Sequence, residues 1–343
     1  MFCALLCLGA QRNRSIRRWN GYTPLAVDGS HVQIPSNIHD EATYFNGTKD
    51  GRGYKLLHLN ALYDLESQLY LDAVIQDGRE EHESRALVEP VDRTELTEPV
   101  ILIADCGYEA YNNIAHIERK YLIRVKDKQG ILSGLGLPDA QEFDAVFSYS
   151  LSKRLTNRIR REPQKYRWTP SEVHFDYIRD ASDALYPISL RVVRFAVKES
   201  MYETVIANLP ADQSPPLLLR ELYHKRWGIE TSFRDLKYTL AQTHFHAKKR
   251  PFIEQEIFSR MTLYNFASLL RLHAIFTQPE GKYLYRVNAA FAAHIAREFL
   301  LGFVPAAKVE SLIAKFLLPV RPGQQKPRNM RVKRPASFQY RMI

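Results

Sequence analysis

RELYHKRWGIETSFRDLKYTL (residues 220–240) sets charged, phenolic and apolar side chains at helical spacing. With about 100° between successive residues of an α-helix, Tyr223, Arg226, Glu230 and Lys237 fall within roughly 60° of one another. A neighbouring stripe is apolar and consists of Leu222, Ile229, Phe233, Leu236 and Leu240. The stretch therefore predicts a helix that buries one side and presents a carboxylate among cations on another. The alternative is an ordinary amphipathic helix with an Arg226–Glu230 ion pair at i,i+4.

Two apolar runs upstream each lead into an aspartate. LAVDGS (residues 25–30) contains Asp28, and ILIADCGY (residues 101–108) contains Asp105. Such runs are typical of central strands covered on both faces, and ligand residues emerge at the carboxyl ends of these strands. The alternatives are a turn at the Asp28-Gly29 dipeptide and a helix or turn cap at Asp105.

The spacing Tyr-x2-Arg-x3-Glu-x6-Lys resembles the Y-R-E-K motif of the IS4-family DNA transposases. The two aspartate segments resemble the same family, and the likeness runs from about Tyr22 to about Ala267. It implies that Asp28, Asp105 and Glu230 are the catalytic and metal-binding residues. It also implies DNA contacts by the other three members of the motif, which are Tyr223, Arg226 and Lys237.

Three converging carboxylates suit the chemistry of phosphodiester cleavage and strand transfer. A pair of divalent ions about 4 Å apart activates the attacking oxygen and stabilises the leaving one. Mg²⁺ prefers carboxylate and water ligands, so we expect two Mg²⁺ ions, with Mn²⁺ as a substitute.

The order of predicted elements indicates an α/β fold. Strands are expected to end at Asp28 and to cover residues 54–64, 70–76, 100–105 and 121–126, with helices over about 80–92 and 108–119. This order, βββαβαβ, is that of the ribonuclease H fold. We therefore predict a ribonuclease H-like mixed sheet with helices on both faces, interrupted by a β-rich insertion.

The insertion is predicted from four alternating segments, FDAVFSYSL, EVHFDYI, ISLRVVRFAV and YETVIANL. It also carries a basic run that ends in Trp168, which we interpret as a core residue rather than a stacking surface for bases. The predicted domains are a remnant of an N-terminal DNA-binding region or linker (1–21), the first part of the core (22–126), the insertion (127–211), the second part of the core (212–275), C-terminal helices (276–318) and a basic flexible tail (319–343).

Composition favours a polyanionic partner. There are 48 Lys+Arg against 38 Asp+Glu in 343 residues, which gives a net charge of +10 and a pI of about 9.4. The three cysteines, Cys3, Cys7 and Cys106, form no paired framework and predict reduced thiols. No apolar run approaches the length of a membrane span, so we expect a bacterial, cytoplasmic and nucleoid-associated protein without a membrane partner.

These observations predict the transposase of an insertion sequence, which cleaves transposon ends and joins them to target DNA by a cut-and-paste route. Its expected partners are double-stranded DNA, as inverted-repeat ends and target, and a second copy on that DNA. Only 27 residues precede Asp28, fewer than the resemblance implies, so we expect an N-terminally shortened DNA-binding region. The alternatives are a truncated, noncatalytic DNA-binding remnant and a general ribonuclease H-like nuclease.

Overall fold

A computed structural model describes residues 18–35, 40–46, 53–94, 99–117, 119–127, 129–180, 182–240 and 244–320. Contacts among residues divide the chain into two units. Within the described ranges, unit 1 contains residues 29–81 and 228–320, and unit 2 contains residues 18–28 and 82–227. Most of the predicted N-terminal remnant, including Cys3 and Cys7, and almost all of the predicted basic tail lie outside the described residues.

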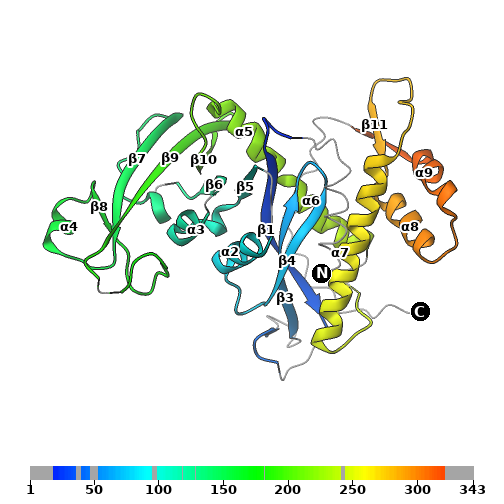
Figure 1. The fold of residues 1–343 in the computed structure, drawn as a ribbon, viewed down its shortest axis with the longest axis horizontal. Coiled ribbons are helices and arrows are strands. Elements are labelled where there is room, and N and C mark those ends of the chain that lie inside the picture. The colour runs from blue at the N-terminus through cyan, green and yellow to red at the C-terminus, as the bar shows by residue number, and fades with distance from the viewer. Residues whose placement is uncertain are drawn as a thin grey trace. The chain divides into compact units, whose positions relative to one another are not determined.

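Parallel strands form the centre of unit 2 (Figure 1). The first residues of β1 (Thr23–Ile34) pair in parallel with β5 (Val100–Ala104), which pairs in parallel with β6 (Lys120–Val125). All five residues of β5 are buried, as expected of a strand covered on both faces. Helix α2 (Glu83–Arg93) precedes β5, and α3 (Tyr111–His116) lies between β5 and β6 in the chain.

The predicted insertion continues this sheet. It contains β7 (Phe143–Ser152), α4 (Asn157–Arg161), β8 (Tyr166–Trp168), β9 (Leu185–Lys198) and β10 (Met201–Ala207). Strand β10 pairs antiparallel with both β6 and β9, so the strand order in unit 2 is β1-β5-β6-β10-β9-β7-β8. The antiparallel pairing of β10 with β6 makes the sheet mixed.

One of the four strands expected in this region is absent. Residues 172–178 (EVHFDYI) form turns instead of a strand, although Phe175 and Ile178 are buried. The ring of Phe175 packs edge-on against Tyr186, with 5.1 Å between the ring centroids. The alternating apolar residues of this segment therefore cover a small cluster beside β9 without pairing as a strand.

Unit 1 is built on an antiparallel pair of strands, β3 (Tyr54–Asp64) and β4 (Leu69–Asp77), which closely match the predicted ranges. Strand β3 also lies between β1 and the short β2 (Tyr44–Phe45). Helix α7 (Arg250–His273) contacts β4. Its Asn265 side chain accepts a hydrogen bond from the Tyr70 backbone N–H at 2.8 Å and donates to the Tyr70 carbonyl at 2.7 Å, which fixes the helix on the strand.

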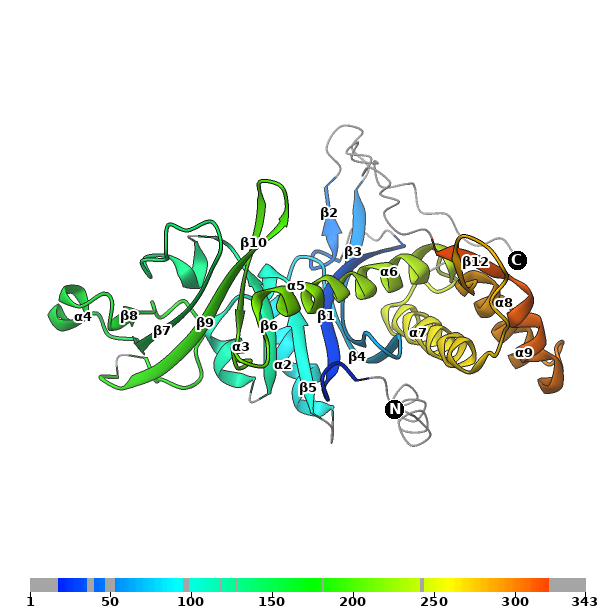
Figure 2. The ribbon, with the colours of Figure 1, turned by 90° about the horizontal axis from the view of Figure 1, so that it is seen from above.

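The C-terminal part of unit 1 has its own small core. Its helices are drawn in orange in Figure 2. Helices α8 (Ala289–Leu300) and α9 (Ala306–Lys315) pack around a buried cluster consisting of Val287, Ala292, Ile295, Val309 and Ile313. Strand β11 (Leu284–Val287) pairs antiparallel with β12 (Leu317–Val320). Residues 319 and 320, which begin the predicted flexible tail, thus belong to a strand.

The stretch at residues 220–240 is not one continuous α-helix, so that prediction is wrong. It forms α5 (Pro216–Lys225), α6 (Trp227–Arg234) and a π-helical segment, η3 (Asp235–Thr239). The predicted apolar stripe is confirmed in its main members, because Leu222, Ile229 and Leu236 are fully buried. The wider π-helical turn at Lys237 changes the angular spacing on which the prediction rested.

The first strand does not end at Asp28, which corrects a second prediction. Strand β1 continues to Ile34, so the Asp28-Gly29 dipeptide lies inside a strand and is not a turn. Gly29 faces β3 closely: a Cβ atom there would lie 2.3 Å from His58 Nε2. The glycine allows this approach of two strands.

The chain order β1, β3, β4, α2, β5, α3, β6 is the predicted βββαβαβ. The predicted fold class, a ribonuclease H-like α/β fold with a large mixed sheet, is confirmed. The unit boundaries at 28/29, 81/82 and 227/228 fall inside the predicted core segments, and the domain limits inferred from the sequence stay a prediction. None of the helices in the described part of the chain has the length and apolar character needed to cross a membrane.

Candidate active site

Asp28 and Asp105 lie side by side in unit 2. The register of the parallel strands β1 and β5 pairs Val27 with Ala104, so each aspartate is the next residue on its chain. Adjacent strands are about 4.8 Å apart, which brings the two carboxylates to the same edge. Their side chains are 19% and 27% exposed, so both remain accessible to solvent.

Arg226 joins the two aspartates. Its Nη1 lies 3.1 Å from Asp28 Oδ2, and its Nη2 lies 3.5 Å from Asp105 Oδ2. The residue is only 3% exposed and its guanidinium lies over the rings of Tyr223 and Trp227, at 5.5 and 5.7 Å from the centroids. Its positive charge offsets the repulsion between two neighbouring carboxylates.

Asp105 is held at several points. Its Oδ1 accepts a hydrogen bond from the backbone N–H of Cys106 at 2.6 Å, so it caps the 3₁₀ turn η1 (Cys106–Tyr108). The same oxygen lies 2.7 Å from Arg124 Nε and 3.4 Å from the Tyr223 hydroxyl. The capping role considered for Asp105 is therefore real, and it orients the carboxylate that Arg226 also contacts.

Two further residues of this site lie outside the Tyr-Arg-Glu-Lys motif, although Tyr108 is the last residue of the ILIADCGY segment. Arg124 interrupts the apolar strand β6, and its Nη1 also lies 3.7 Å from Glu203 Oε1. Tyr108 is buried, and burial, reinforced by the charges of Asp28, Glu83 and Asp105, raises the pKa of its phenol well above the usual value. A charged residue inside an otherwise buried strand was the one available hint for Arg124.

Glu230 and Lys237 belong to unit 1. Glu230 lies on α6, four residues after Arg226 in the chain, and is partly exposed. Lys237 Nζ donates to Ser30 Oγ at 2.7 Å, and burial lowers the pKa of the Lys237 ammonium. The convergence of Glu230 with the two aspartates stays a prediction.

The two aspartates fit a hard divalent cation. Carboxylate oxygens are the ligands that Mg²⁺ prefers, and the ion keeps several waters, which the partial exposure of both side chains allows. The cationic partner Arg226 occupies one oxygen of each carboxylate at distances near 3 Å or more. The donor set is thus compatible with the metal chemistry predicted from the sequence.

The residues predicted to contact DNA, and those of the basic run in the insertion, differ in how exposed they are. Tyr223 and Arg226 are each 3% exposed and turn toward the aspartates, so phosphate contact by either stays a prediction. In the basic run of the insertion, Lys153 is buried, with Nζ 3.3 Å from the carbonyl of Pro170. The interpretation of Trp168 as a core residue is wrong, because 45% of it is exposed at the edge strand β8.

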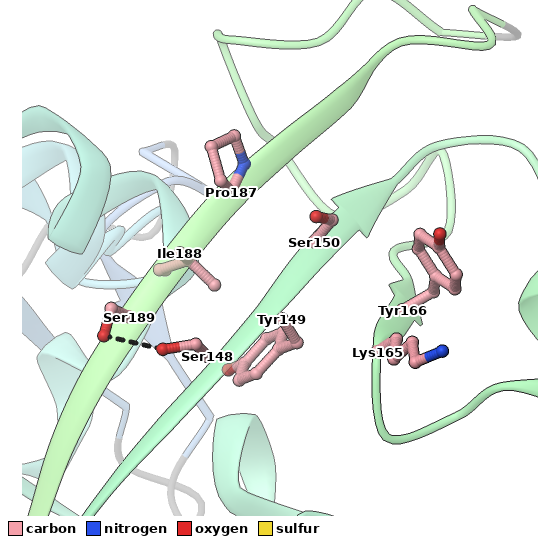
Figure 3. Close-up of a pocket in the computed structure, with 8 residues that line it drawn as sticks. All are labelled: Ser148, Tyr149, Ser150, Lys165, Tyr166, Pro187, Ile188 and Ser189. Atoms are coloured by element: carbon pink, nitrogen blue, oxygen red, sulfur yellow. Dashed lines mark hydrogen bonds between the residues drawn. The ribbon is translucent and has the colours of Figure 1, made fainter.

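A shallow pocket of about 520 Å³ lies on the sheet of the predicted insertion (Figure 3). Hydroxyl groups, one ammonium and two aromatic rings line it, from Ser148, Tyr149, Ser150, Lys165, Tyr166, Pro187, Ile188 and Ser189. Ser148 and Ser189 are hydrogen-bonded across β7 and β9 at 3.0 Å. None of the predicted site residues lines this pocket, so it is separate from the aspartates.

Comparison with known proteins gives one family. The family model described as the transposase DDE domain matches residues 19–266. No curated protein matches the sequence significantly. Among solved structures, the chain is similar to a piggyBac transposase synaptic complex with hairpin DNA, at 9% identity and a TM-score of 0.42, over 88% of this chain and 59% of the other. The chain therefore spans about three fifths of that transposase.

Proposed function

Because the chain belongs to the transposase DDE domain family, we propose that it is the catalytic part of an insertion-sequence transposase related to the IS4 family. In this proposal it cleaves the inverted-repeat ends of its element and joins them to target DNA by a cut-and-paste route. The bound partners are double-stranded DNA and a second copy of the chain on that DNA. The net charge of +10 supports a polyanionic partner.

The observation that carries the proposal is the pair of aspartates that follow the register pair Val27–Ala104 of β1 and β5. Two acidic groups at one sheet edge, both within 3.5 Å of one guanidinium, are costly to bring together without a function. We propose that Asp28, Asp105 and Glu230 are the catalytic and metal-binding residues. Transposase DDE domains generally use divalent metal ions, and we propose two Mg²⁺ ions, which would activate the attacking oxygen and stabilise the leaving 3′ oxygen.

The remaining residues position these groups. Arg226 holds Asp28 and Asp105 in one geometry, and Arg124 with the Cys106 N–H fixes the rotamer of Asp105. Tyr223 stays neutral, because burial raises the pKa of its phenol, and it donates its O–H to Asp105. In the proposed complex Arg226, Tyr223 and Lys237 also contact phosphates of the transposon end, with Arg suited to bidentate contact.

A cleavage assay tests the function. The protein is incubated with labelled duplexes that carry the inverted repeats flanking its reading frame, and with Mg²⁺ or Mn²⁺. We expect cleavage at the repeat ends, which Asp28→Asn, Asp105→Asn or Glu230→Gln should reduce to background while gel-shift binding to the same duplex persists. The matched control is Glu221→Gln, an exposed glutamate on α5 nine residues before Glu230, which should cleave like the wild type.

The outcomes separate the competing functions. Cutting of random-sequence duplexes without preference for the repeat ends would indicate a general ribonuclease H-like nuclease. Salt-sensitive DNA binding without metal-dependent cutting would indicate a noncatalytic remnant. Cleavage that survives Glu230→Gln would remove Glu230 from the proposed catalytic set.

Metal binding has a separate readout. Divalent ions that bind only the folded state raise its melting temperature. We expect millimolar Mg²⁺ to raise the melting temperature of the wild type, and Asp105→Asn to lose most of this increment. Equal increments in the two proteins would contradict a metal site at Asp105.

A further inference from the structure

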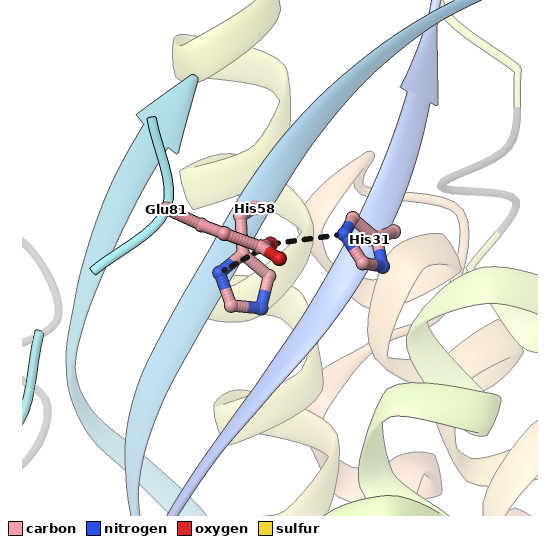
Figure 4. A group of neighbouring side chains, drawn as sticks. All are labelled: His31, His58 and Glu81. Atoms are coloured by element: carbon pink, nitrogen blue, oxygen red, sulfur yellow. Dashed lines mark hydrogen bonds and ion pairs between the residues drawn. The ribbon is translucent and has the colours of Figure 1, made fainter. Parts of the chain in front are cut away.

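Unit 1 contains a second group of potential ligands that neither the transposase motif nor the aspartate pair includes. His31 lies in β1, His58 lies in β3, and Glu81 follows the end of β4. Figure 4 shows the three side chains pointing toward one another. They are far apart in the chain, and the strand pairing of unit 1 brings them together.

The donor atoms are close enough for one metal ion. Glu81 Oε2 lies 3.0 Å from His31 Nε2 and 3.3 Å from His58 Nδ1, and all three donor atoms lie within 4.8 Å of one another. Bonds of about 2.0–2.1 Å in a tetrahedral site place neighbouring ligand atoms about 3.3–3.4 Å apart. The observed separations therefore need only small side-chain shifts to admit an ion.

The two edges of the buried His58 ring face different neighbours. His58 is 4% exposed, and its Nε2 edge faces Gly29, where a Cβ atom would lie only 2.3 Å from that nitrogen. Its Nδ1 edge accordingly faces Glu81. The Asn60 amide nitrogen lies 3.3 Å from His58 Nδ1 and also 3.3 Å from Gln76 Oε1, so it has a second acceptor when Nδ1 is engaged elsewhere.

The neutral imidazole is the form of histidine that binds metals. The Glu81 carboxylate would partly neutralise the charge of an ion near Lys237.

From this geometry we propose that His31, His58 and Glu81 form a binding site for a first-row transition-metal ion, with Zn²⁺ as the best fit. Two imidazoles and one carboxylate are a ligand set that Zn²⁺ accepts, and they leave a fourth position open. The half-exposed side chains of His31 and Glu81 put that position toward solvent. Mg²⁺, which prefers oxygen ligands, should not compete here.

The site would join three separate parts of unit 1. An ion bound by His31, His58 and Glu81 would tie β1 and β3 to the segment after β4, and thereby stabilise the strand that carries Asp28 three residues before His31. Metal binding to preorganised side chains adds folding free energy. The proposal is independent of the proposed transposition chemistry.

Binding is tested on the full chain after removal of metals by a chelator. Zn²⁺ is titrated against a chromophoric chelator, and Co²⁺ is added separately because its visible absorption reports tetrahedral nitrogen and oxygen ligands. We expect one Zn²⁺ per chain and a tetrahedral Co²⁺ spectrum in the wild type and in Asp105→Asn. His31→Ala and the isosteric Glu81→Gln should weaken binding by more than the roughly 10–100-fold that loss of an outer-shell partner costs.

His294→Ala is the matched control, because His294 is an exposed histidine of unit 1 whose side chain is 58% exposed, close to the 50% of His31. It should bind Zn²⁺ like the wild type. Circular dichroism of the metal-free variants shows whether each still folds. If His31→Ala does not fold, Glu81→Gln tests the site in its place. Binding that is absent from the wild type, or unchanged in both His31→Ala and Glu81→Gln, would overturn the proposal, as would a loss of binding confined to Asp105→Asn.

Discussion

Arg226 determines the electrostatic balance of the aspartate pair. It is almost fully buried, and one guanidinium faces two carboxylates that are themselves partly open to solvent. A buried charge of this kind is expensive unless it is paired, so Arg226 and the aspartates depend on one another. The pairing also implies that a divalent cation can replace part of the charge neutralisation that Arg226 provides to the two aspartates.

Replacing Arg226 with alanine tests this dependence. We expect Arg226→Ala to destabilise the protein by about 2–3 kcal/mol, less than a fully buried pair would lose, because the aspartates are partly solvated. Mg²⁺ should recover more stability in this variant than in the wild type. Urea denaturation with and without Mg²⁺ measures both effects, and the exposed Arg234→Ala on α6 should stay within about 0.5 kcal/mol of the wild type.

A second residue-scale prediction concerns pH. The hydrogen bond from the Lys55 ammonium, at 2.5 Å, is the main cause that lowers the pKa of Asp40, and Lys55 is buried. A carboxyl whose folded-state pKa is depressed adds stability that is present above its unfolded pKa and is lost as the pH falls through the folded value. Asp40 is 39% exposed, so we expect Asp40→Asn to cost only about 1 kcal/mol at pH 7.

The difference in stability between Asp40→Asn and the wild type should shrink as the pH falls through the range in which Asp40 titrates. Urea denaturation at a series of pH values follows it, with Asp212→Asn, an exposed aspartate in a turn, as the control. A constant difference across the acid range would show that the Asp40 carboxylate does not act through its charge.

At the scale of elements, β1 is the strand on which both candidate sites depend. It carries Asp28, then Gly29, then His31, and Gly29 lets the strand approach His58 and Asn60. Neither neighbour can move easily, since His58 is 4% exposed and Asn60 is fully buried. Gly29 is therefore needed for the close packing of β1 against β3, and it does not form a turn.

Two glycine substitutions give opposite expectations. Gly29→Ala places a methyl group 2.3 Å from His58 Nε2 and 2.9 Å from Asn60 Oδ1, and should destabilise the protein by about 1–3 kcal/mol. Gly228→Ala meets only the end of the Leu65 side chain, at 3.0 Å, and should gain up to about 1 kcal/mol from helix propensity. Thermal denaturation measures the stability of both variants. Equal stabilities of Gly29→Ala and Gly228→Ala would contradict the close approach of β1 to β3.

Elements that can be recognised from their own run of apolar residues were predicted from the sequence. Strands β3, β4, β5 and β6 were predicted to within about two residues at either end, because each is an apolar run that ends at a change of composition. The second half of β1 was missed because Asp28-Gly29 is a strong turn signal, whereas Val32 and Ile34 alternate with polar residues as a strand requires. In that case the tertiary approach to β3 outweighed the local signal.

The candidate site was predictable only in part, for a similar reason. Aspartates at the ends of apolar strands can be found from the sequence, since strand register brings them together. What a helical residue faces cannot be read from its spacing, so the contact of Arg226 with both aspartates was not predicted. The cluster of His31, His58 and Glu81 has no characteristic spacing, because β1, β3 and the segment after β4 contribute one ligand each.

At the scale of the whole molecule, the excess of basic residues bears on assembly. A net charge of +10 opposes association of two copies in the absence of a counter-charge and favours their meeting on a polyanion. Cleavage of two transposon ends in concert, as proposed above, also requires two copies on one DNA complex. Both considerations predict that assembly depends on DNA.

We therefore predict that the protein is monomeric or weakly associated alone and forms a dimer on duplexes that carry the repeat ends. Multi-angle light scattering measures the mass with and without DNA. DNA binding itself should weaken steeply as salt rises, because phosphate contacts release counterions. A tight dimer in the absence of DNA, at moderate salt, would contradict this prediction.

The division of the chain also constrains how the gene can be altered. The backbone passes from one unit to the other at 28/29, 81/82 and 227/228, and the first of these passages lies within β1. No single contiguous fragment therefore contains a whole unit and nothing else. A stop codon before residue 227 would remove parts of both units together, so a gene shortened in this way should lose function in one step rather than retain one whole unit.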